Sequence, residues 1–147
     1  MLAKLRIREL LSLRNVELEL GKLNVLVGPN GSGKSNVVKA LRLLAEHARS
    51  GLPDLPGYKS FKELAYNFNA RAEVLVEAEV SVGKRKRARY SLAITADNYR
   101  EEVHVNGTKA LAGDGISPSG RVLSQHGLKN ISRLAPLVKP RLLSRSL

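Results

Sequence analysis

A glycine-rich run from Gly28 to Ser35 constrains this chain more than any other feature of its sequence. The run reads Gly-Pro-Asn-Gly-Ser-Gly-Lys-Ser and fits the spacing G-x-x-x-x-G-K-[ST]. Its glycines, Gly28 and Gly33, allow backbone angles that other residues resist, so the loop can turn its N–H groups inward around phosphate oxygens. The pattern predicts a phosphate-binding loop, in which Lys34 reaches the β- and γ-phosphates of a nucleoside triphosphate and the Ser35 hydroxyl ligates Mg²⁺.

The segments on either side of this loop fit that interpretation. Leu23–Val27 is a short, mostly apolar run of the kind that forms a buried strand. From Lys34 the pattern becomes helical, with apolar residues on one predicted face. That face consists of Val37, Val38, Leu41, Leu44 and Ala45. A strand before the loop and a helix after it are the context in which the motif binds ATP with Mg²⁺. The nucleotide-binding residues that we expect are Asn30, Gly31, Ser32, Gly33, Lys34, Ser35 and Asn36.

Composition adds a strong positive charge to this outline. The chain carries 25 Lys and Arg residues against 13 Asp and Glu residues, a formal net charge of +12. Such a balance favours a polyanionic partner, with nucleic acid as the first candidate. The alternative is an exposed surface adapted to high temperature. Both interpretations remain open from the sequence alone.

Several classes of protein are excluded or disfavoured. The chain has no cysteine, which excludes disulfides and thiolate metal sites. Its histidines, His47, His104 and His126, lack ligand spacing and are interpreted as ordinary surface or packing residues. No apolar run approaches the roughly 20 residues that a membrane-spanning helix needs. We therefore expect a cytoplasmic protein that is not embedded in a membrane.

The order of patterns predicts a single α/β domain, with a mixed sheet, a helix after the phosphate loop and an antiparallel β-meander. Alternating residues indicate strands early in the chain and again in its middle. Asn106-Gly107 is the strongest hairpin signal, and the sequence after Ala110 looks loop-like. We divide residues 1–147 into strands, loop and first helix (1–50), a loop or short helix (51–71), the antiparallel β subdomain (72–110) and a basic tail (111–147).

The first 50 residues resemble the N-terminal lobe of the SMC/RecF-type ABC ATPases, and most closely the RecF-like and OLD-like predicted ATPases. The resemblance rests on Ile7–Leu18, on Leu23–Asn36 with its Gly-Pro-Asn-Gly-Ser-Gly-Lys-Ser-Asn, and on Ala40-Leu41. The chain departs from the family at a turn, with Leu10-Leu11-Ser12 where Phe-Arg-Ser is usual. Arg14 is a candidate to replace the missing basic residue. The resemblance implies an antiparallel sheet beside the nucleotide and an ATP molecule sandwiched between two protomers.

The family also implies residues that act on Mg²⁺ and on the attacking water. A glutamine that ends a strand does so, and the only glutamine here is Gln125, which becomes a candidate for Mg²⁺ binding and catalysis together with Lys34. Hydrolysis further needs a signature motif and four apolar residues followed by Asp-Glu. No such Asp-Glu run occurs in this sequence. We therefore expect an incomplete domain that binds ATP without efficient hydrolysis unless a second lobe with these motifs completes it, since a homodimer of this chain would lack them in both copies.

Basic residues gather at a predicted hairpin in the middle of the chain. They are Lys84, Arg85, Lys86, Arg87 and Arg89. Such a cluster can neutralise DNA phosphates without reading the sequence of the DNA. The alternative is a solvated turn whose cations keep a sheet edge from pairing. DNA therefore remains one candidate partner of this chain.

The main functional hypothesis from the sequence is an ATP-binding lobe of a RecF/SMC-like ATPase. DNA maintenance or defence against foreign DNA, through ATP-dependent association of protomers such as a homodimer, is what the resemblance implies. A non-catalytic binding module switched by nucleotide is the first alternative. A transporter-type ABC domain is the second, and the pattern from Ile7 to Leu20 disfavours it.

Overall fold

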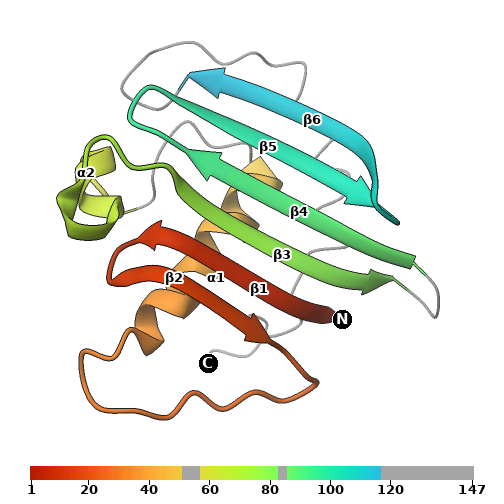
Figure 1. The fold of residues 1–147 in the computed structure, drawn as a ribbon, viewed down its shortest axis with the longest axis horizontal. Helices are drawn as coiled ribbons and strands as arrows, with labels where there is room; N and C mark the ends of the chain where they lie inside the picture. Colours follow the sequence, from red (N-terminus) through yellow and green to blue (C-terminus); the bar gives the residue numbers. More distant parts are fainter. Residues whose placement is uncertain (51–56, 83–85, 117–147) are drawn as a thin grey trace.

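Six strands and one long helix dominate the computed structural model, which describes residues 1–50, 57–82 and 86–116. The elements are β1 (Leu2–Leu10), β2 (Leu13–Glu19), α1 (Lys34–Ser50), α2 (Phe61–Leu64), a 3₁₀ turn (Tyr66–Phe68), β3 (Val74–Val82), β4 (Lys86–Ile94), β5 (Asn98–Val105) and β6 (Thr108–Ile116). Figure 1 shows the strands as one sheet with α1 behind it. The predicted α/β class with an antiparallel meander is confirmed.

The sheet has the order β2-β1-β3-β4-β5-β6, and each neighbouring pair is antiparallel. The described residues therefore form an antiparallel sheet and not the mixed sheet expected from the sequence, since Leu23–Val27 does not join it as a strand. Strand β1 joins the N-terminal hairpin to the meander, because it pairs with β2 on one side and with β3 on the other. Alternation explains why these segments form strands. In β3, for example, Val74 and Val76 are buried, whereas the intervening side chains face the other way.

The hairpin between β5 and β6 confirms the strongest turn signal in the sequence. Asn106 has φ of 51° and Gly107 has φ of 83°. Two successive residues with positive φ are what a two-residue type I′ turn requires, and Asn-Gly adopts it readily. The Asn106 side chain also accepts a hydrogen bond from the backbone N–H of Arg87 at 3.0 Å, which ties the turn to β4.

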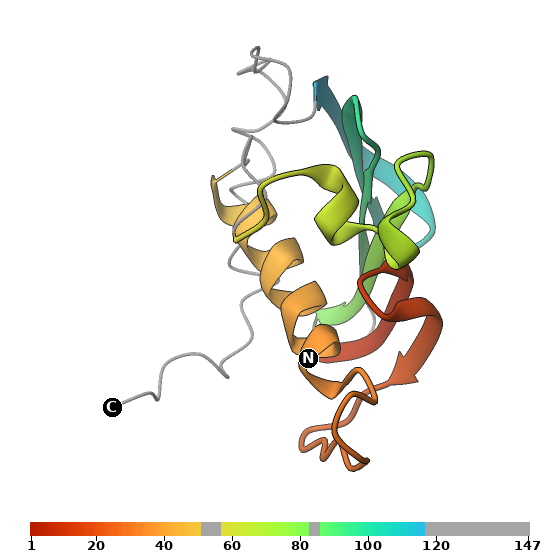
Figure 2. The same ribbon diagram turned by 90° about the vertical axis from the view of Figure 1, so that its left-hand side faces the viewer.

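Helix α1 covers one face of the sheet, as Figure 2 shows, and the hydrophobic core lies between them. Val37, Ala40 and Leu44 of α1 are buried in this core. The predicted apolar face was wrong for Val38, which is 52% exposed, while His47 is buried on the stripe with Ala40 and Leu44. In the described part of the chain, neither helix has the length and apolar character that crossing a membrane requires.

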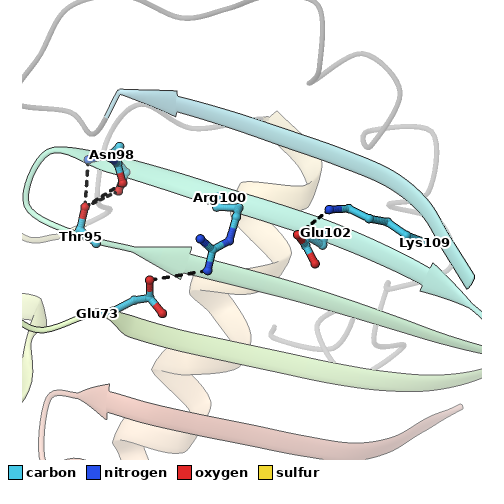
Figure 3. Close-up of polar contacts among 6 residues, drawn as sticks. All are labelled: Glu73, Thr95, Asn98, Arg100, Glu102 and Lys109. Carbon is cyan, nitrogen blue, oxygen red and sulfur yellow. Dashed lines mark hydrogen bonds and ion pairs between the residues drawn. The ribbon is translucent and has the colours of Figure 1, made fainter. Parts of the chain in front are cut away.

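The opposite face of the sheet is polar and held together by ion pairs between strands. Figure 3 shows part of it, with Arg100 beside Glu73 and Lys109 beside Glu102. Nearer the N-terminus, Arg6 donates to Glu17 at 2.7 Å and to Glu77 at 2.9 Å, and Lys4 also pairs with Glu17. These cations lower the pKa of Glu17, first through the hydrogen bonds that Lys4 and Arg6 donate.

Two expectations about strands were wrong. Leu23–Val27 forms no strand and pairs with no neighbour in the described structure, although its composition is that of a buried strand. Conversely, the loop expected after Ala110 is the second part of β6, which pairs with β5 as far as Ile116. Glycines in that stretch lowered its apparent strand character, but backbone pairing with β5 does not need side chains.

Candidate nucleotide-binding site

The predicted phosphate loop lies between β2 and α1, below the sheet and the helix in Figure 2. The special backbone angle that the sequence predicted for Gly28 and Gly33 is found at Gly33 but not at Gly28, and Gly31 has one as well. Gly31 and Gly33 have φ of +81° and +91°, the left-handed region that other residues adopt at a cost. A Cβ atom on Gly33 would lie 2.8 Å from Leu13 Cδ2, so the end of the Leu13 side chain would have to shift.

The start of α1 exposes backbone donors to the loop. The N–H groups of Asn36 and Val37 donate to the carbonyl oxygen of Gly33 at 2.9 and 3.1 Å, so the helix begins at Lys34. Within the described residues, the backbone N–H groups of Lys34 and Ser35 have no acceptor. Unpaired N–H groups at the positive end of a helix dipole attract an anion.

The ammonium group of Lys34 is folded onto the loop itself. Its Nζ donates to the carbonyl oxygens of Gly28 and Pro29, both at 2.6 Å, and to Ser32 Oγ at 3.1 Å. An ammonium group has three donors, and these contacts can use all of them. The loop therefore surrounds a positive charge, and a phosphate that enters must share or replace these acceptors.

The turn between β1 and β2 supports the loop from one side. Asn36 Nδ2 donates to Ser12 Oγ at 2.8 Å, and the side chain of Leu13 lies against Gly33. The helix start and the loop are thus fixed to the edge of the sheet. Asn36, which was predicted to bind nucleotide, holds this turn through its side chain.

The residues present fit Mg²⁺ only as partners of a bound nucleotide. Ser35 is exposed at the first turn of α1. Among the residues that the structure describes, no group of three or more His, Asp or Glu side chains is arranged to hold a metal. Mg²⁺ is commonly held by one or two protein groups together with phosphates and water, and Ser35 can supply one of them.

Several predicted site residues fall outside the described ranges. Gln125 is among them, as are Lys84 and Arg85 of the basic hairpin. Lys86 begins β4, Arg87 is exposed, and Arg89 is half-buried on the polar face in register with Glu79 and His104. The structure therefore places part of the basic cluster at one end of β4.

Arg14 lies in a recess rather than beside the loop. The recess has a volume of about 360 Å³ and is lined by Arg8, Glu9, Arg14, Asn15, Glu73 and Leu75. An adjoining recess of about 450 Å³ also contains Glu9 and Arg14, together with Tyr66, Asn67, Asn69 and Ala72. No residue of the phosphate loop lines either one, so this geometry gives no support to Arg14 as a nucleotide contact.

Sequence reasoning missed one property of the site, the exposure of the apolar run that leads into the loop. Leu23, Val25 and Val27 are 84%, 75% and 88% exposed, and Leu26 is 42% exposed. Contiguous exposed apolar residues mark an interaction surface more often than scattered ones do. The signal in the sequence was the same apolar run that predicted a buried strand.

Comparisons with known proteins agree with this geometry. A family model described as "AAA domain, putative AbiEii toxin, Type IV TA system" matches residues 23–123, which is more than half of the chain. The chain belongs to this AAA-domain family. A search of curated proteins finds no match.

Solved structures share the fold. A structure from work on ATP-driven dimerization and DNA-stimulated activation of SMC ATPases has a TM-score of 0.59 and 16% identity, covering 93% of this chain and 78% of that chain. A structure of the recombination mediator protein RecF with ATP has a TM-score of 0.54 and 23% identity, covering 75% of this chain and 28% of RecF. The family model confirms the predicted ATPase domain, and the solved structures confirm that its fold is that of the RecF/SMC type.

Proposed function

We propose that this chain binds ATP with Mg²⁺ on the loop Gly28–Ser35, as the ATP-binding lobe of a RecF/SMC-like ATPase. The observation that carries the proposal is the set of hydrogen-bond donors at the loop. The ammonium group of Lys34 lies inside it, and the N–H groups of Lys34 and Ser35 point from a helix start without acceptors. The work on RecF includes a complex with ATP, and its fold is shared by this chain.

A nucleotide titration tests this proposal. Lys34→Ala removes the only side-chain cation among the loop residues, and we expect it to abolish measurable binding of ATP with Mg²⁺. Lys39→Ala is the matched control, because Lys39 is exposed on the same helix and outside the loop. Equal affinity of the Lys34 variant and the wild type, or no binding by either protein, would contradict the proposal.

The exposed run Leu23–Val27 supports a further part of the proposal, namely a partner that completes the domain. Apolar side chains with unpaired backbone beside a ligand site are suited to pairing with a strand supplied from elsewhere. A second lobe or a partner protomer would bring that strand, but only a separate second lobe could also bring the Asp and Glu residues that hydrolysis needs, since a second copy of this chain lacks them too. ATP would then drive the association and its hydrolysis would release the partners.

Light scattering at increasing protein concentration tests association in the form of a homodimer. We expect the apparent mass to rise when ATP and Mg²⁺ are added to the wild type, and not with Lys34→Ala. Val25→Lys should also lower the association if the apolar run takes part in it. An unchanged mass at all concentrations would exclude the homodimer and leave a separate second lobe as the partner.

DNA is the second proposed partner, because Arg87 and Arg89 lie in the first half of β4 and follow the other basic residues of the cluster in the sequence. A role in DNA maintenance or defence requires that this chain or its assembly binds DNA. In retardation assays over a salt series, Arg87→Ala with Arg89→Ala should weaken binding to duplex DNA and reduce its salt dependence. Arg100→Ala is the control, since Arg100 is paired with Glu73.

A non-catalytic module switched by nucleotide is the alternative function. The observation that favours it concerns Asp97. Of all residues in the sequence, Asp97 comes nearest to the required pattern of apolar residues followed by Asp-Glu. Asp97 lies in the exposed turn between β4 and β5, which hydrogen bonds between Thr95 and Asn98 close, as Figure 3 shows. Prolonged incubation with ATP and Mg²⁺ distinguishes the two, because turnover that Lys34→Ala abolishes would exclude a non-catalytic module.

A further inference from the structure

Two polar side chains in the described part of the chain are buried, and they contact each other. His47 is 4% exposed and Glu101 is 0% exposed. His47 Nε2 lies 3.1 Å from Glu101 Oε2. Since His47 belongs to α1 and Glu101 to β5, the contact joins the helix that follows the phosphate loop to strand β5 of the sheet.

A tyrosine from a third element completes the cluster. The hydroxyl of Tyr90, on β4, donates to Glu101 Oε2 at 2.8 Å. Burial, followed by the negative charge of Glu101, raises the pKa of Tyr90 well above its usual value, so the hydroxyl remains a donor. The ring of Tyr99 meets His47 edge-on, with centroids 4.8 Å apart.

The neighbouring strand leaves room for these side chains. In the register of β5 and β6, Glu101 is opposite Gly113 and Tyr99 is opposite Gly115. Glycine in a strand interior often marks a place where another group must approach closely. The glycines that made β6 look like a loop in the sequence are therefore opposite the two β5 residues that contact His47.

A buried carboxyl group of this kind is sensitive to its partners. Removing either partner leaves an unpaired polar group in the core. Among the described residues, Glu101 Oε1 and His47 Nε2 have no partner with hydrogen-bond geometry, so His47 meets Glu101 as a close polar contact and not as a hydrogen bond. Such a buried contact adds little net stability, but it brings the two side chains together at one place in the core.

Helix α1 is therefore fixed to the sheet by polar contacts near both of its ends. Near the loop, Asn36 donates to Ser12, and three turns later His47 meets Glu101. Between these points the helix contacts the sheet through apolar side chains such as Ala40 and Leu44, whose attraction does not depend on direction. The polar contacts are the ones that can define how the helix is rotated and shifted.

We propose that His47, Glu101 and Tyr90 form a positioning cluster that fixes α1 on the sheet and so holds Lys34 and Ser35 in place for a triphosphate. The cluster is buried and lies near the opposite end of α1 from the loop, so its residues act through the helix. This inference rests on the proposed binding of ATP at the loop. It adds that the geometry of the loop depends on a contact at the opposite end of α1.

The test compares Glu101→Gln with Glu102→Gln, in the full chain. The two changes are identical and one residue apart, but Glu102 faces the polar side, where it pairs with Lys109. At a temperature where both variants are fully folded, Glu101→Gln should weaken ATP affinity at least about five-fold, and Glu102→Gln should not. Wild-type affinity in folded Glu101→Gln would overturn the proposal, because a merely stabilising role lowers the melting temperature alone.

Hydrogen exchange of the backbone separates this proposal from the one on which it rests. Amides of residues 34–40 should exchange faster in Glu101→Gln than in Glu102→Gln, whether or not ATP binds. If wild-type protein binds no ATP, the proposed function fails, and exchange alone then decides the role of the cluster. Equal exchange in the two variants would overturn that role.

A second variant, with apolar residues in place of the polar pair, keeps the test possible if Glu101→Gln does not fold. His47→Leu combined with Glu101→Leu removes both polar groups together, a change that many cores tolerate. We expect this protein to fold and to keep the faster exchange at residues 34–40, because no directional contact remains. Recovery of both wild-type exchange and wild-type ATP affinity would show that apolar packing suffices, and would overturn the proposal.

Discussion

Strand β3 and the run Leu23–Val27 have similar apolar residues but opposite surroundings. In β3, Val74 and Val76 are completely buried between β1 and β4, and against the core under α1. In the run, Val25 and Val27 are mostly exposed, and no strand in the described structure lies beside them. Apolar character therefore shows that a segment suits burial, whereas the presence of a neighbour decides whether it is buried.

The difference also separates stability from function in this molecule. The sheet and α1 contain the hydrophobic core, and the exposed stretch before α1 contains the residues proposed to bind nucleotide and partner. Substitutions in the first region should act on unfolding, and those in the second on binding. The following predictions test that division in order of decreasing effect on stability.

The largest difference in the free energy of unfolding should appear when a leucine is replaced by alanine in each of the two regions. Leu5→Ala, at a completely buried position of β1, should lower the free energy of unfolding by roughly 2–5 kcal/mol through lost burial and a cavity. Leu23→Ala, where the leucine is 84% exposed, should change it by no more than about 0.5 kcal/mol. Urea unfolding measures both. A large loss in the Leu23 variant would mean that the run is buried in solution.

The second prediction concerns two glycines of the loop that share the left-handed conformation. Gly31→Ala meets no atom within 4 Å and should destabilise its loop by about 1–2 kcal/mol from backbone strain alone. Gly33→Ala also places Cβ 2.8 Å from Leu13 and should cost more. Nucleotide titration and thermal unfolding of both variants check this order. If the Gly31 variant is the worse of the two, the contact between loop and turn is not maintained.

A smaller effect is expected on the polar face, through pH. The hydrogen bond from Lys109 holds the pKa of Glu102 below its ordinary value of 4.5. A carboxyl whose folded pKa is lowered stabilises the protein above its unfolded pKa, and this contribution is lost as the pH falls through the folded pKa. Glu102→Gln should therefore cost up to about 1 kcal/mol at pH 7 and nothing at strongly acid pH. Unfolding at several pH values measures the difference.

The smallest effect on stability should accompany a clear change at the surface. Val25→Lys with Val27→Lys should leave the free energy of unfolding within about 0.5 kcal/mol of wild type, because both side chains are exposed. The same change should reduce binding of a dye that is specific for exposed apolar surface. Unchanged dye binding would assign the accessible apolar surface to other residues, such as Phe68, which is 72% exposed.

Local patterns in the sequence predicted the parts of the molecule whose partners are near in the chain. Alternation predicted the meander, and Asn106-Gly107 predicted its last turn, because each hairpin brings its own neighbour. The fold and family resemblance followed from the phosphate loop and the segments around it. The contribution of each loop residue to nucleotide binding stays a prediction.

Other features could not be predicted, because they depend on tertiary contacts. Glu101 stands between Arg100 and Glu102 in the sequence, and its charge alone suggests the polar face that those two neighbours occupy. Only its complete burial and its contacts with His47 and Tyr90 show that it points into the core. Val38 was expected on the apolar face of α1 but is exposed, whereas His47 is buried, since helical periodicity alone does not fix which way α1 is rotated on the sheet.

The pairing of β1 with β3 has a consequence for the order in which the chain folds. Hairpins such as β3–β4 and β5–β6 need only short loops to close, and isolated hairpins form in microseconds. The pairing of β1 with β3 must instead close over the phosphate loop, α1 and α2, which carries a larger entropic barrier. We therefore expect the meander to form first, with the phosphate loop and its helix becoming ordered only when β1 docks on its edge.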